Sequence, residues 1–545
     1  MKARITAALT ALALVTGLAP AVPDSLVQAA LTAHAEETVS GTCGEHLTWT
    51  LEDGTLTISG EGRMYNYSFF RTPWYKDPAL ASEVSYAGEV ETVILEYGVT
   101  SIGEFAFRGM TNLRSVSVPD SVTSIGMYAF YDCGVLPSVY IPEGVTSIGE
   151  YAFWGCAALT GATIPEGVMR IEERTFFGCN SLTSVRIPDG VTDIGEYAFY
   201  DCAQLTGIAL PESVTEIGAG AFCGCAGLTD MRIPGGVTSI GGSTFEGCTS
   251  LTDMRIPAGV TSIGVGAFSR CTSLTRIVIP ENVTDIPNTV FHDCTALTQV
   301  QLPAGVTSIG DSAFSGCTSL TRIAIPDGVT SIGGSAFKGC TSLTHITIPD
   351  SVTSIGKYLF KNCTGLTGAY LGTGLTVIEE EMFYGCESLQ NVNIRDGVTG
   401  IGDYAFAYCT SLGPVILPDS VFYVGKYAYY MSCPGTVTVL RDKCYFGTCA
   451  FYNGYTSLGV LSSDITVYGH EGADFNIGFT ALEDPPVTGN VDLLGRISLT
   501  DVIALQKHLV NEKPFIAAQL ALADLNADGR VDVIDLTLLK QTLTH

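Results

Sequence analysis

The sequence contains few basic residues and few histidines. Lys and Arg together number 27 against 55 Asp and Glu, which gives a formal net charge of −28, and there are only 7 histidines. This negative charge would repel phosphate backbones and anionic lipid headgroups, so we expect neither nucleic acid nor a membrane surface as a partner. The histidines are dispersed and no Ser-His-Asp or Cys-His arrangement is indicated, so we expect no catalytic residues and no enzyme.

Long apolar runs are also missing, since none beyond the N-terminus is long enough to cross a bilayer. At the N-terminus, Lys2 and Arg4 precede an apolar run. Small residues that suit cleavage of a signal peptide follow at Ala21 and just before Glu36. This pattern is typical of a secretory signal peptide over residues 1–35. A membrane anchor fits less well because the run is short and is followed by prolines. We therefore expect a secreted, extracellular protein without membrane insertion.

From Val99 onward the chain repeats itself every 23 residues, as "VTSIGEYAFWGCAALTGATIPEG" at Val145 and "VTSIGGSAFKGCTSLTHITIPDS" at Val329 illustrate. Equivalent positions follow without an insertion at Val99, Val122, Val145, Val168, Val191, Val214, Val237, Val260, Val283, Val306, Val329, Val352, Leu375, Val398 and Val421. About 15 turns of constant length predict a mainly β solenoid over residues 99–440.

One strand is expected in each turn. In the turn that begins at Val329, "LTHITIP" places Ile346 and Ile348 inward with polar residues beside them, and Pro349 ends the segment. This period of two predicts a strand, whereas "GSAF" is too short for more than a turn or a helical piece. Parallel strands stack about 4.8 Å apart, so the array should form a rod or arc about 70 Å long.

Most cysteines recur with the same period. They are Cys133, Cys156, Cys179, Cys202, Cys225, Cys248, Cys271, Cys294, Cys317, Cys340, Cys363, Cys386 and Cys409. Stacked equivalent residues lie too far apart for a relaxed disulfide, and no histidine shares the period to complete a metal site. Met110 occupies the same position in the first turn, so we interpret the column as small core hydrophobes. Cys433, Cys444 and Cys449 break the period, and a disulfide could form among them.

The pattern "VTSIGxxAFxGCTSLTxIxIPxS" resembles the BspA-type leucine-rich repeats of bacterial surface and secreted proteins. The resemblance extends over about 340 residues in constant register. It implies a leucine-rich repeat solenoid and a role in binding or adhesion, without indicating the ligand.

Both ends of the array need a cover for their apolar faces. Residues 36–98 suit an N-terminal β cap, because "LTWTLEDGTLTIS" contains two alternating strands around an Asp53-Gly54 turn, the signature of a hairpin. At the other end, residues 441–482 lose the period and are expected to form a C-terminal cap. The proline-rich residues 483–488 predict a short, stiff linker.

The chain closes on an acidic loop, "DLNADGRVDVID". In EF-hand-type loops, oxygen ligands come from positions 1, 3, 5, 7, 9 and 12, and glycine stands at position 6. Gly529 occupies the glycine position. The predicted Ca²⁺ ligands are Asp524, Asn526, Asp528, the carbonyl group of Arg530, Asp532 and Asp535.

An imperfect copy of this loop, "NVDLLGRISLTD", lies upstream. Its predicted ligands are Asn490, Asp492 and Asp501, while Leu494 at position 5 supplies no oxygen. We therefore expect this loop to bind Ca²⁺ more weakly than the other.

Each loop runs into one amphipathic segment, so residues 489–545 contain the same loop-helix unit twice. This duplicated unit resembles a type I dockerin, a small all-α, EF-hand-like module that folds around calcium and docks to cohesin modules of a scaffoldin in the cellulosome. An ordinary calcium sensor fits less well, because "DPPVTGN" cannot form a helix before the first loop. The family's cohesin-binding positions fall on Leu499, Thr500, Gln506, Lys507, Val533, Ile534, Lys540 and Gln541.

Outward strand positions carry a row of arginines, namely Arg186, Arg232, Arg255, Arg276 and Arg322. Two interpretations are open. Asp230 and Asp253 could neutralise Arg232 and Arg255 across adjacent strands, as a solvated charge ladder. Alternatively, the row could bind an anionic partner, such as a uronic-acid polysaccharide or an acidic protein.

A second row is aromatic and consists of Tyr131, Trp154, Phe177 and Tyr200. Aromatic faces in a line can stack on sugar rings or mark a protein-binding patch. Burial between neighbouring turns is the alternative.

Taken together, these patterns predict a non-catalytic binding or adhesion protein. Its repeats would engage a polysaccharide, cell-surface or protein partner, and its dockerin would dock to a cohesin in the presence of Ca²⁺. A free adhesin with a stabilising calcium module is the main alternative, and a dockerin-borne hydrolase is a third.

Overall fold

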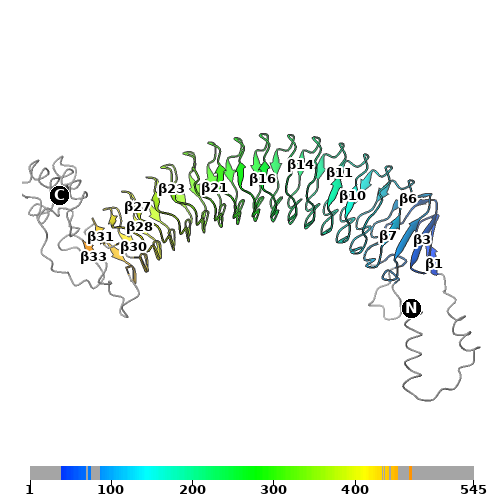
Figure 1. Ribbon diagram of the computed structural model, residues 1–545, viewed down its shortest axis with the longest axis horizontal. Coiled ribbons are helices and arrows are strands. Elements are labelled where there is room, and N and C mark those ends of the chain that lie inside the picture. Colours follow the sequence, from blue (N-terminus) through cyan, green and yellow to red (C-terminus); the bar gives the residue numbers. More distant parts are fainter. Residues whose placement is uncertain are drawn as a thin grey trace, which may run out of the picture.

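The computed structural model describes residues 39–68, 71–74, 86–432, 434, 436–440, 444–451 and 466–468. The described chain is a β solenoid of about 15 turns that bends into an arc, with the N-terminal cap at one end (Figure 1). None of the described residues forms a helix, so none of them provides one long and apolar enough to span a bilayer. The expected signal peptide, linker and dockerin lie outside the described residues.

The predicted strand is present in most turns and forms a parallel row along the arc, here called the first strand row. It consists of β5 (Thr92–Leu95), β7 (Ser115–Ser117), β10 (Gly161–Thr163), β12 (Ser184–Arg186), β16 (Asp253–Arg255), β18 (Arg276–Val278), β20 (Gln299–Gln301), β23 (His345–Thr347), β25 (Gly368–Tyr370), β27 (Asn391–Asn393), β29 (Val415–Leu417), β31 (Thr436–Val439) and β33 (Thr466–Tyr468). In four turns the equivalent residues 138–140, 207–209, 230–232 and 322–324 continue the row without forming a strand, apart from an isolated bridge between Gly207 and Asp230. Neighbouring strands pair with a constant offset of one turn, as Asp253 with Arg276.

A second parallel row, not expected from the sequence, arises from the "VTSI" segment of each turn. It consists of β4 (Gly62–Arg63), β6 (Val99–Ile102), β8 (Ser124–Ile125), β9 (Ser147–Ile148), β11 (Arg170–Ile171), β13 (Asp193–Ile194), β14 (Glu216–Ile217), β15 (Ser239–Ile240), β17 (Ser262–Ile263), β19 (Asp285–Ile286), β21 (Ser308–Ile309), β22 (Ser331–Ile332), β24 (Ser354–Ile355), β26 (Val377–Ile378), β28 (Gly400–Ile401), β30 (Tyr423–Val424) and β32 (Tyr445–Phe446). Most of these strands have two residues, too few for an alternating pattern to indicate them.

The core lies between the two strand rows and repeats in every turn. Its most regular feature is a column of phenylalanines from Phe107 to Phe406, each ring lying against the ring of the next turn with centroids 5.3–5.8 Å apart. Nearly all of these side chains are fully buried. Because each turn covers the apolar face of its neighbour, the array stabilises itself by stacking.

The cysteine column lies beside the phenylalanines and is fully buried, which confirms the core prediction. Each thiol also donates a hydrogen bond to the carbonyl group of a phenylalanine 26 residues earlier, as Cys133 does to Phe107, with S···O distances of 3.0–3.3 Å. Ser432 occupies the next cysteine position and donates to Phe406 in the same way. Burial raises the pKa of these thiols, to about 12 for Cys156.

A tight turn follows the second strand row in each repeat. Its second residue lies in the left-handed region of backbone conformation, with φ of 59° at Phe105 and 53° at Ser243. Glycine adopts this conformation without strain, yet few turns have glycine at this position. The equivalent residues, here called the left-handed column, are Phe105, Tyr128, Tyr151, Arg174, Tyr197, Gly220, Ser243, Gly266, Thr289, Ser312, Ser335, Tyr358, Glu381, Tyr404 and Tyr427.

The N-terminal end is covered by three antiparallel strands, β1 (Val39–Thr42), β2 (Leu47–Glu52) and β3 (Thr55–Gly60). The predicted hairpin is present, with Asp53 and Gly54 at positive φ in its turn. β3 then pairs in parallel with β5 and so begins the solenoid. The Trp74 ring stacks on Phe107 and donates its indole N–H to the carbonyl group of Ala106 at 2.7 Å, which closes the phenylalanine column.

At the C-terminal end, parallel pairing continues beyond residue 440, where we expected the repeats to stop. β32 pairs with β30, and β33 pairs with β31. Tyr429 and Phe451 extend the ring column, with centroids 5.2 Å apart. The spacing between these two rings is 22 residues, so a search for the constant 23-residue period misses this turn.

Candidate functional site

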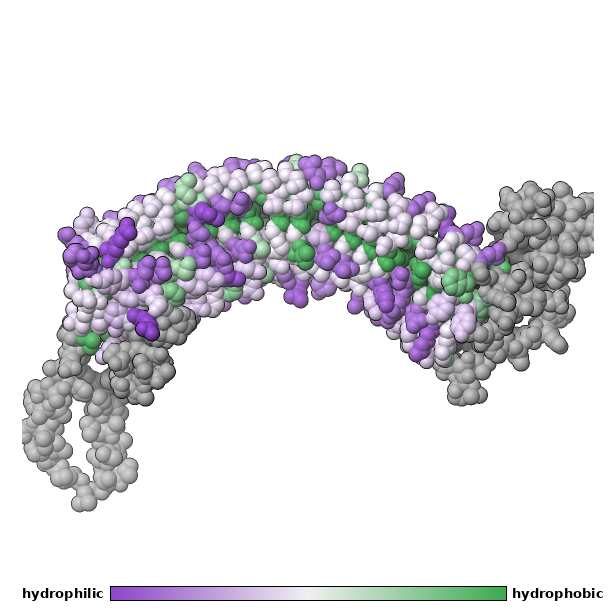
Figure 2. All heavy atoms as spheres, turned by 180° about the vertical axis from the view of Figure 1, so that it is seen from behind, coloured by the Kyte–Doolittle hydropathy of each residue, from purple (hydrophilic) through white to green (hydrophobic). Residues whose placement is uncertain are grey.

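The outer face of the first strand row is a regular surface that the turns share. In most of the three-residue strands the middle residue points inward and the residues on either side point outward, as Asp253 and Arg255 do around the buried Met254. The outward residues therefore form two columns along the arc. Figure 2 shows hydrophilic residues distributed along the molecule, with more apolar residues in a band between them.

The structure places all five predicted arginines on this outer face, exposed to solvent. Three of them form ion pairs with carboxylates of the preceding turn. The pairs are Arg186 with Glu166 at 2.7 Å, Arg232 with Glu212 at 3.0 Å, and Arg276 with Asp253 at 2.8 Å. Within the described residues, Arg255 and Arg322 form no ion pair.

These partners differ from the ones proposed from the sequence. Asp253 pairs with Arg276 instead of Arg255, because Arg276 lies directly opposite it in the parallel register. The hydrogen bond from Arg276 lowers the pKa of Asp253. Such exposed pairs contribute little to stability, and they leave Arg255 as a cation without a carboxylate partner among the described residues.

Three hollows of about 450–500 Å³ lie on this face. One lies between Tyr140 and Arg186, and the other two adjoin each other on both sides of Arg255. In the described part of the chain, no three His, Cys, Asp or Glu side chains are grouped so that they could hold a metal ion. The polar groups of the hollows can donate and accept hydrogen bonds, which is the chemistry of recognition.

The aromatic row lies on a different surface, at the turns. Tyr131, Trp154, Phe177 and Tyr200 are half-buried and stack on one another, with ring centroids 4.3, 5.5 and 4.3 Å apart. Both faces of the Trp154 and Phe177 rings are therefore covered by neighbouring rings. This geometry supports the alternative of burial between turns, since no free face remains on these two rings for a sugar.

The left-handed column lies beside this row and contains a residue whose role the sequence did not suggest. Phe105, Tyr128 and Tyr151 stack with centroids 4.5–4.6 Å apart, and Arg174 then takes the place of a ring. Its guanidinium carbon lies 5.3 Å from the ring centre of Tyr151 and 4.7 Å from that of Tyr197. The 23-residue register places Arg174 between two tyrosines, and that signal could have identified the contact.

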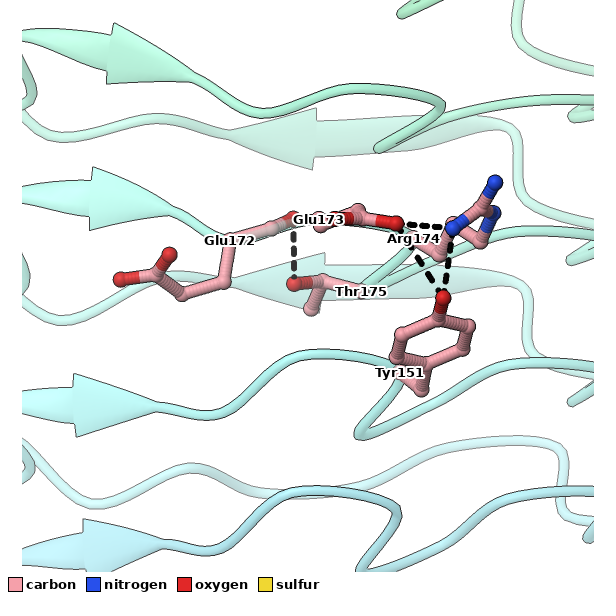
Figure 3. Close-up of polar contacts among 5 residues, drawn as sticks. All are labelled: Tyr151, Glu172, Glu173, Arg174 and Thr175. Atoms are coloured by element: carbon pink, nitrogen blue, oxygen red, sulfur yellow. Dashed lines mark hydrogen bonds and ion pairs between the residues drawn. The ribbon is translucent and has the colours of Figure 1, made fainter.

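Figure 3 shows how this contact is held. Glu173 and Arg174 both reach the hydroxyl group of Tyr151, which belongs to the preceding turn, and Glu173 also pairs with Arg174. Thr175 donates to the carbonyl group of Glu172 at 2.8 Å and so closes the tight turn. The cluster links two turns and is saturated with internal partners, which indicates a structural role.

The predicted calcium and cohesin-binding residues all lie outside the described residues. This applies to the ligands of both loops and to the eight cohesin-binding positions between Leu499 and Gln541. The proposed disulfide near the array's end also stays a prediction, because Cys433 lies outside the described residues. These assignments depend on the sequence pattern alone.

The fold and the repeated outer face define the class of protein, a bacterial-type leucine-rich repeat solenoid. The model of the BspA-type leucine-rich repeat region matches residues 81–206, 169–298 and 284–412, which together exceed half of the chain. The chain therefore belongs to the BspA-type leucine-rich repeat family. The model of the dockerin type I domain matches residues 489–544, so the chain has the organisation of a cellulosome-type adhesion or binding protein.

The chain is similar to solved bacterial leucine-rich repeat proteins. A leucine-rich repeat protein from Bacteroides ovatus is 28% identical over 78% of this chain and 99% of its own, with a TM-score of 0.51. A leucine-rich cell surface protein from Faecalibacterium prausnitzii is 28% identical over 71% of this chain and 91% of its own, with a TM-score of 0.33. No curated protein matches the chain.

Proposed function

We propose that this chain is a secreted, non-catalytic binding protein whose repeats engage an extracellular partner and whose C-terminal module attaches it to a scaffoldin cohesin. The dockerin match at residues 489–544, beside a long array of surface repeats, carries the proposal. Docking to a cohesin is what a dockerin match implies, so its presence favours attachment over free diffusion. The family models that match the chain contain no catalytic domain, which is consistent with a role in recognition.

Calcium is expected to be the cofactor of the docking module. The second loop offers an oxygen ligand at every position of the template, and its intact ligand set should determine whether residues 489–545 fold. In this proposal Asp524 and Asp528 hold the ion and thereby position the helix that contacts the cohesin. The first loop, with Leu494 at a ligand position, contributes less.

The test is binding of the full chain to a panel of immobilised cohesin modules, with calcium and with excess chelator. We expect binding to at least one cohesin in calcium and none in chelator. Asp524→Ala combined with Asp528→Ala should weaken binding about 100-fold or more, because two ligands of the intact loop are lost. Asp492→Ala in the incomplete loop is the matched control and should have a smaller effect.

Two outcomes would contradict the proposal. If no cohesin in the panel binds the chain, the calcium module stabilises a free adhesin instead. If the double variant keeps full affinity, the second loop does not organise the docking surface. Release of sugar or peptide products by the purified chain would instead favour the hydrolase alternative.

A further inference from the structure

The hollow between Tyr140 and Arg186 has an unusual wall. Tyr140 lies on the outer face of the first strand row and is 58% exposed. Its hydroxyl group donates to Asp120 at 3.4 Å. No other ring and no cation stacks on Tyr140 in the part of the chain that the structure describes. A large aromatic face is thus left open to solvent.

Tyr370 provides the contrast, because it has the same outward position in a later turn. It is 49% exposed, but the guanidinium carbon of Arg395 lies 4.5 Å from its ring centre. The Nε of Arg395 also donates to the carbonyl group of Leu371 at 3.1 Å, so the cation is anchored above the ring. The face of Tyr370 is therefore occupied by the protein itself, whereas that of Tyr140 is vacant.

The next strand lines the floor of the hollow with Thr163, in register between Tyr140 and Arg186, and with Gly161, which has no side chain. Gly161 begins β10, and a Cβ atom added to it would meet only Ser184, at 3.7 Å. The hollow measures about 450 Å³, within the range of about 300–1,000 Å³ that small-molecule sites occupy. Arg186, held by Glu166 at 2.7 Å, forms the opposite wall. Two strand spacings, about 9.6 Å, separate it from Tyr140 along the row.

The charges around the hollow select the kind of ligand. Asp120, Glu143 and Glu166 provide three carboxylates, and Arg186 is the one cation among the residues that line or border the hollow. The whole chain carries a net charge of −28. These negative charges would repel an anionic ligand. A neutral ligand with hydroxyl groups could use the carboxylates as acceptors and the guanidinium as a donor.

We propose that this hollow binds a neutral saccharide unit, with the apolar face of a pyranose ring on Tyr140 and its hydroxyl groups directed to Glu143, Glu166 and Arg186. The assignment rests on the proposed function, in which the repeats bind an extracellular partner, and it names the chemical class of that partner. The ligand stacks on Tyr140 because a sugar ring presents C–H groups to the negative face of an aromatic ring.

The test uses the full chain in calcium and isothermal titration with cellotetraose, xylotetraose and mannotetraose as neutral probes and tetragalacturonate as the anionic probe. We expect at least one neutral probe to bind more tightly than tetragalacturonate. Tyr140→Ala should weaken that binding about tenfold or more, which corresponds to the loss of one aromatic contact. Tyr140→Phe keeps the ring and should stay within about twofold of the unsubstituted chain, since the hydroxyl group faces Asp120.

Two further variants separate binding from folding. Gly161→Val fills the hollow with a side chain that suits a strand and meets no close atom, so it should abolish binding while the melting temperature is unchanged or raised. Tyr370→Ala is the matched control and should leave the affinity unchanged. The assignment is overturned if no neutral probe binds, if tetragalacturonate binds most tightly, or if Tyr140→Ala and Tyr370→Ala behave alike.

The same samples are tested against the cohesin that the chain recognises. Cohesin binding without saccharide binding would overturn the saccharide site and leave the docking proposal intact. Saccharide binding that depends on Tyr140, without cohesin binding, would overturn the docking proposal alone.

Discussion

Two columns of stacked side chains run along the same array and behave differently. The buried column repeats phenylalanine in almost every turn, from Phe107 to Phe406, with a tryptophan before it and a tyrosine after it. The left-handed column at the surface consists of rings from Phe105 to Tyr197 except at Arg174. It then holds Gly, Ser or Thr from Gly220 to Ser335, and rings return at Tyr358 with a further exception at Glu381. Both columns use contacts between adjacent turns, but only the buried one is uniform.

The difference indicates which forces constrain a repeat. Removing a buried ring leaves a cavity that the neighbouring turns cannot fill, so every turn keeps the ring. At the surface, water replaces a missing ring at little cost, and a turn can hold a tyrosine, a charged residue or a glycine. Variation between turns is therefore concentrated on the outside of the solenoid, and binding sites such as the hollow at Tyr140 can arise there without weakening the core.

The strongest test of this contrast is alkaline pH, which acts on the cysteine column of the interior. Burial raises the pKa of these thiols, to about 12 for Cys156 and Cys363, while the unfolded value is about 9. The unfolded chain therefore ionises first, and stability is complete below about pH 9 and falls as pH rises toward 12. Each thiol should remove about 1 kcal/mol of unfolding free energy per pH unit in this window.

Denaturant unfolding of the reduced chain at several pH values between 8 and 11 measures this loss. Cys340→Ser removes one ionisable group and keeps a donor of the kind that Ser432 provides in its own turn, so its profile should be less steep. A free energy of unfolding that does not change between pH 8 and 11 would mean that the thiols are not a buried, neutral column.

A single buried ring should have the next largest effect. Phe245→Ala removes a fully buried side chain whose ring centre lies 5.8 Å from that of Phe222 and 5.4 Å from that of Phe268. We expect a loss of about 3–5 kcal/mol in the free energy of unfolding, measured by denaturant titration at neutral pH. A loss below about 1 kcal/mol would show that adjacent turns can close the gap, and the contrast with the surface would fail.

Substitution of Arg174 tests the left-handed column at a position where an arginine takes the place of an aromatic ring. Arg174→Ala removes a cation from between two tyrosine rings, and we expect a loss of about 1–2 kcal/mol by the same titration. Arg174→Tyr restores the residue type of the adjacent turns and should stay within about 1 kcal/mol of the unsubstituted chain. An equal loss in both variants would mean that the ion pair with Glu173, and not stacking, is the stabilising contact.

The smallest effect is expected where the surface column holds no ring. Ser243 has a φ of 53°, which glycine adopts without strain, so Ser243→Gly should raise the free energy of unfolding by about 0.5–1 kcal/mol. Ser239, four residues earlier, lies in β15, and Ser239→Gly should lower it by a similar amount. Opposite signs from the same substitution would support the backbone argument, and equal signs would contradict it.

Much of the fold could be predicted because the constant period determines which residues of adjacent turns lie next to each other. Once the 23-residue spacing is recognised, Phe245 must lie between Phe222 and Phe268, and the cysteines must stack in the core. The second strand row could not be predicted, since its strands have two residues and show no alternation. The last turn escaped detection because Tyr429 and Phe451 are 22 residues apart.

Less of the candidate site than of the fold could be predicted from the sequence. The five arginines could be placed on the outer face, but their partners depend on side-chain reach, as when Arg232 extends to Glu212 in the preceding turn. The stacking of Trp154 between Tyr131 and Phe177 requires ring orientations that spacing does not supply. The hollow at Tyr140 is lined by Gly161 and Thr163 of the next turn, a combination that no motif describes.

The constant register also has a genetic consequence. Because most turns begin and end at equivalent positions, unequal recombination between two copies of the repeat can delete or add a whole turn without changing the phase of the others. Each such event between Val214 and Val352 would move the C-terminal end of the array about 4.8 Å nearer to Tyr140 or farther from it. Related chains could thus differ in the length of the array while they keep the same core, the same end caps and the same surface hollow.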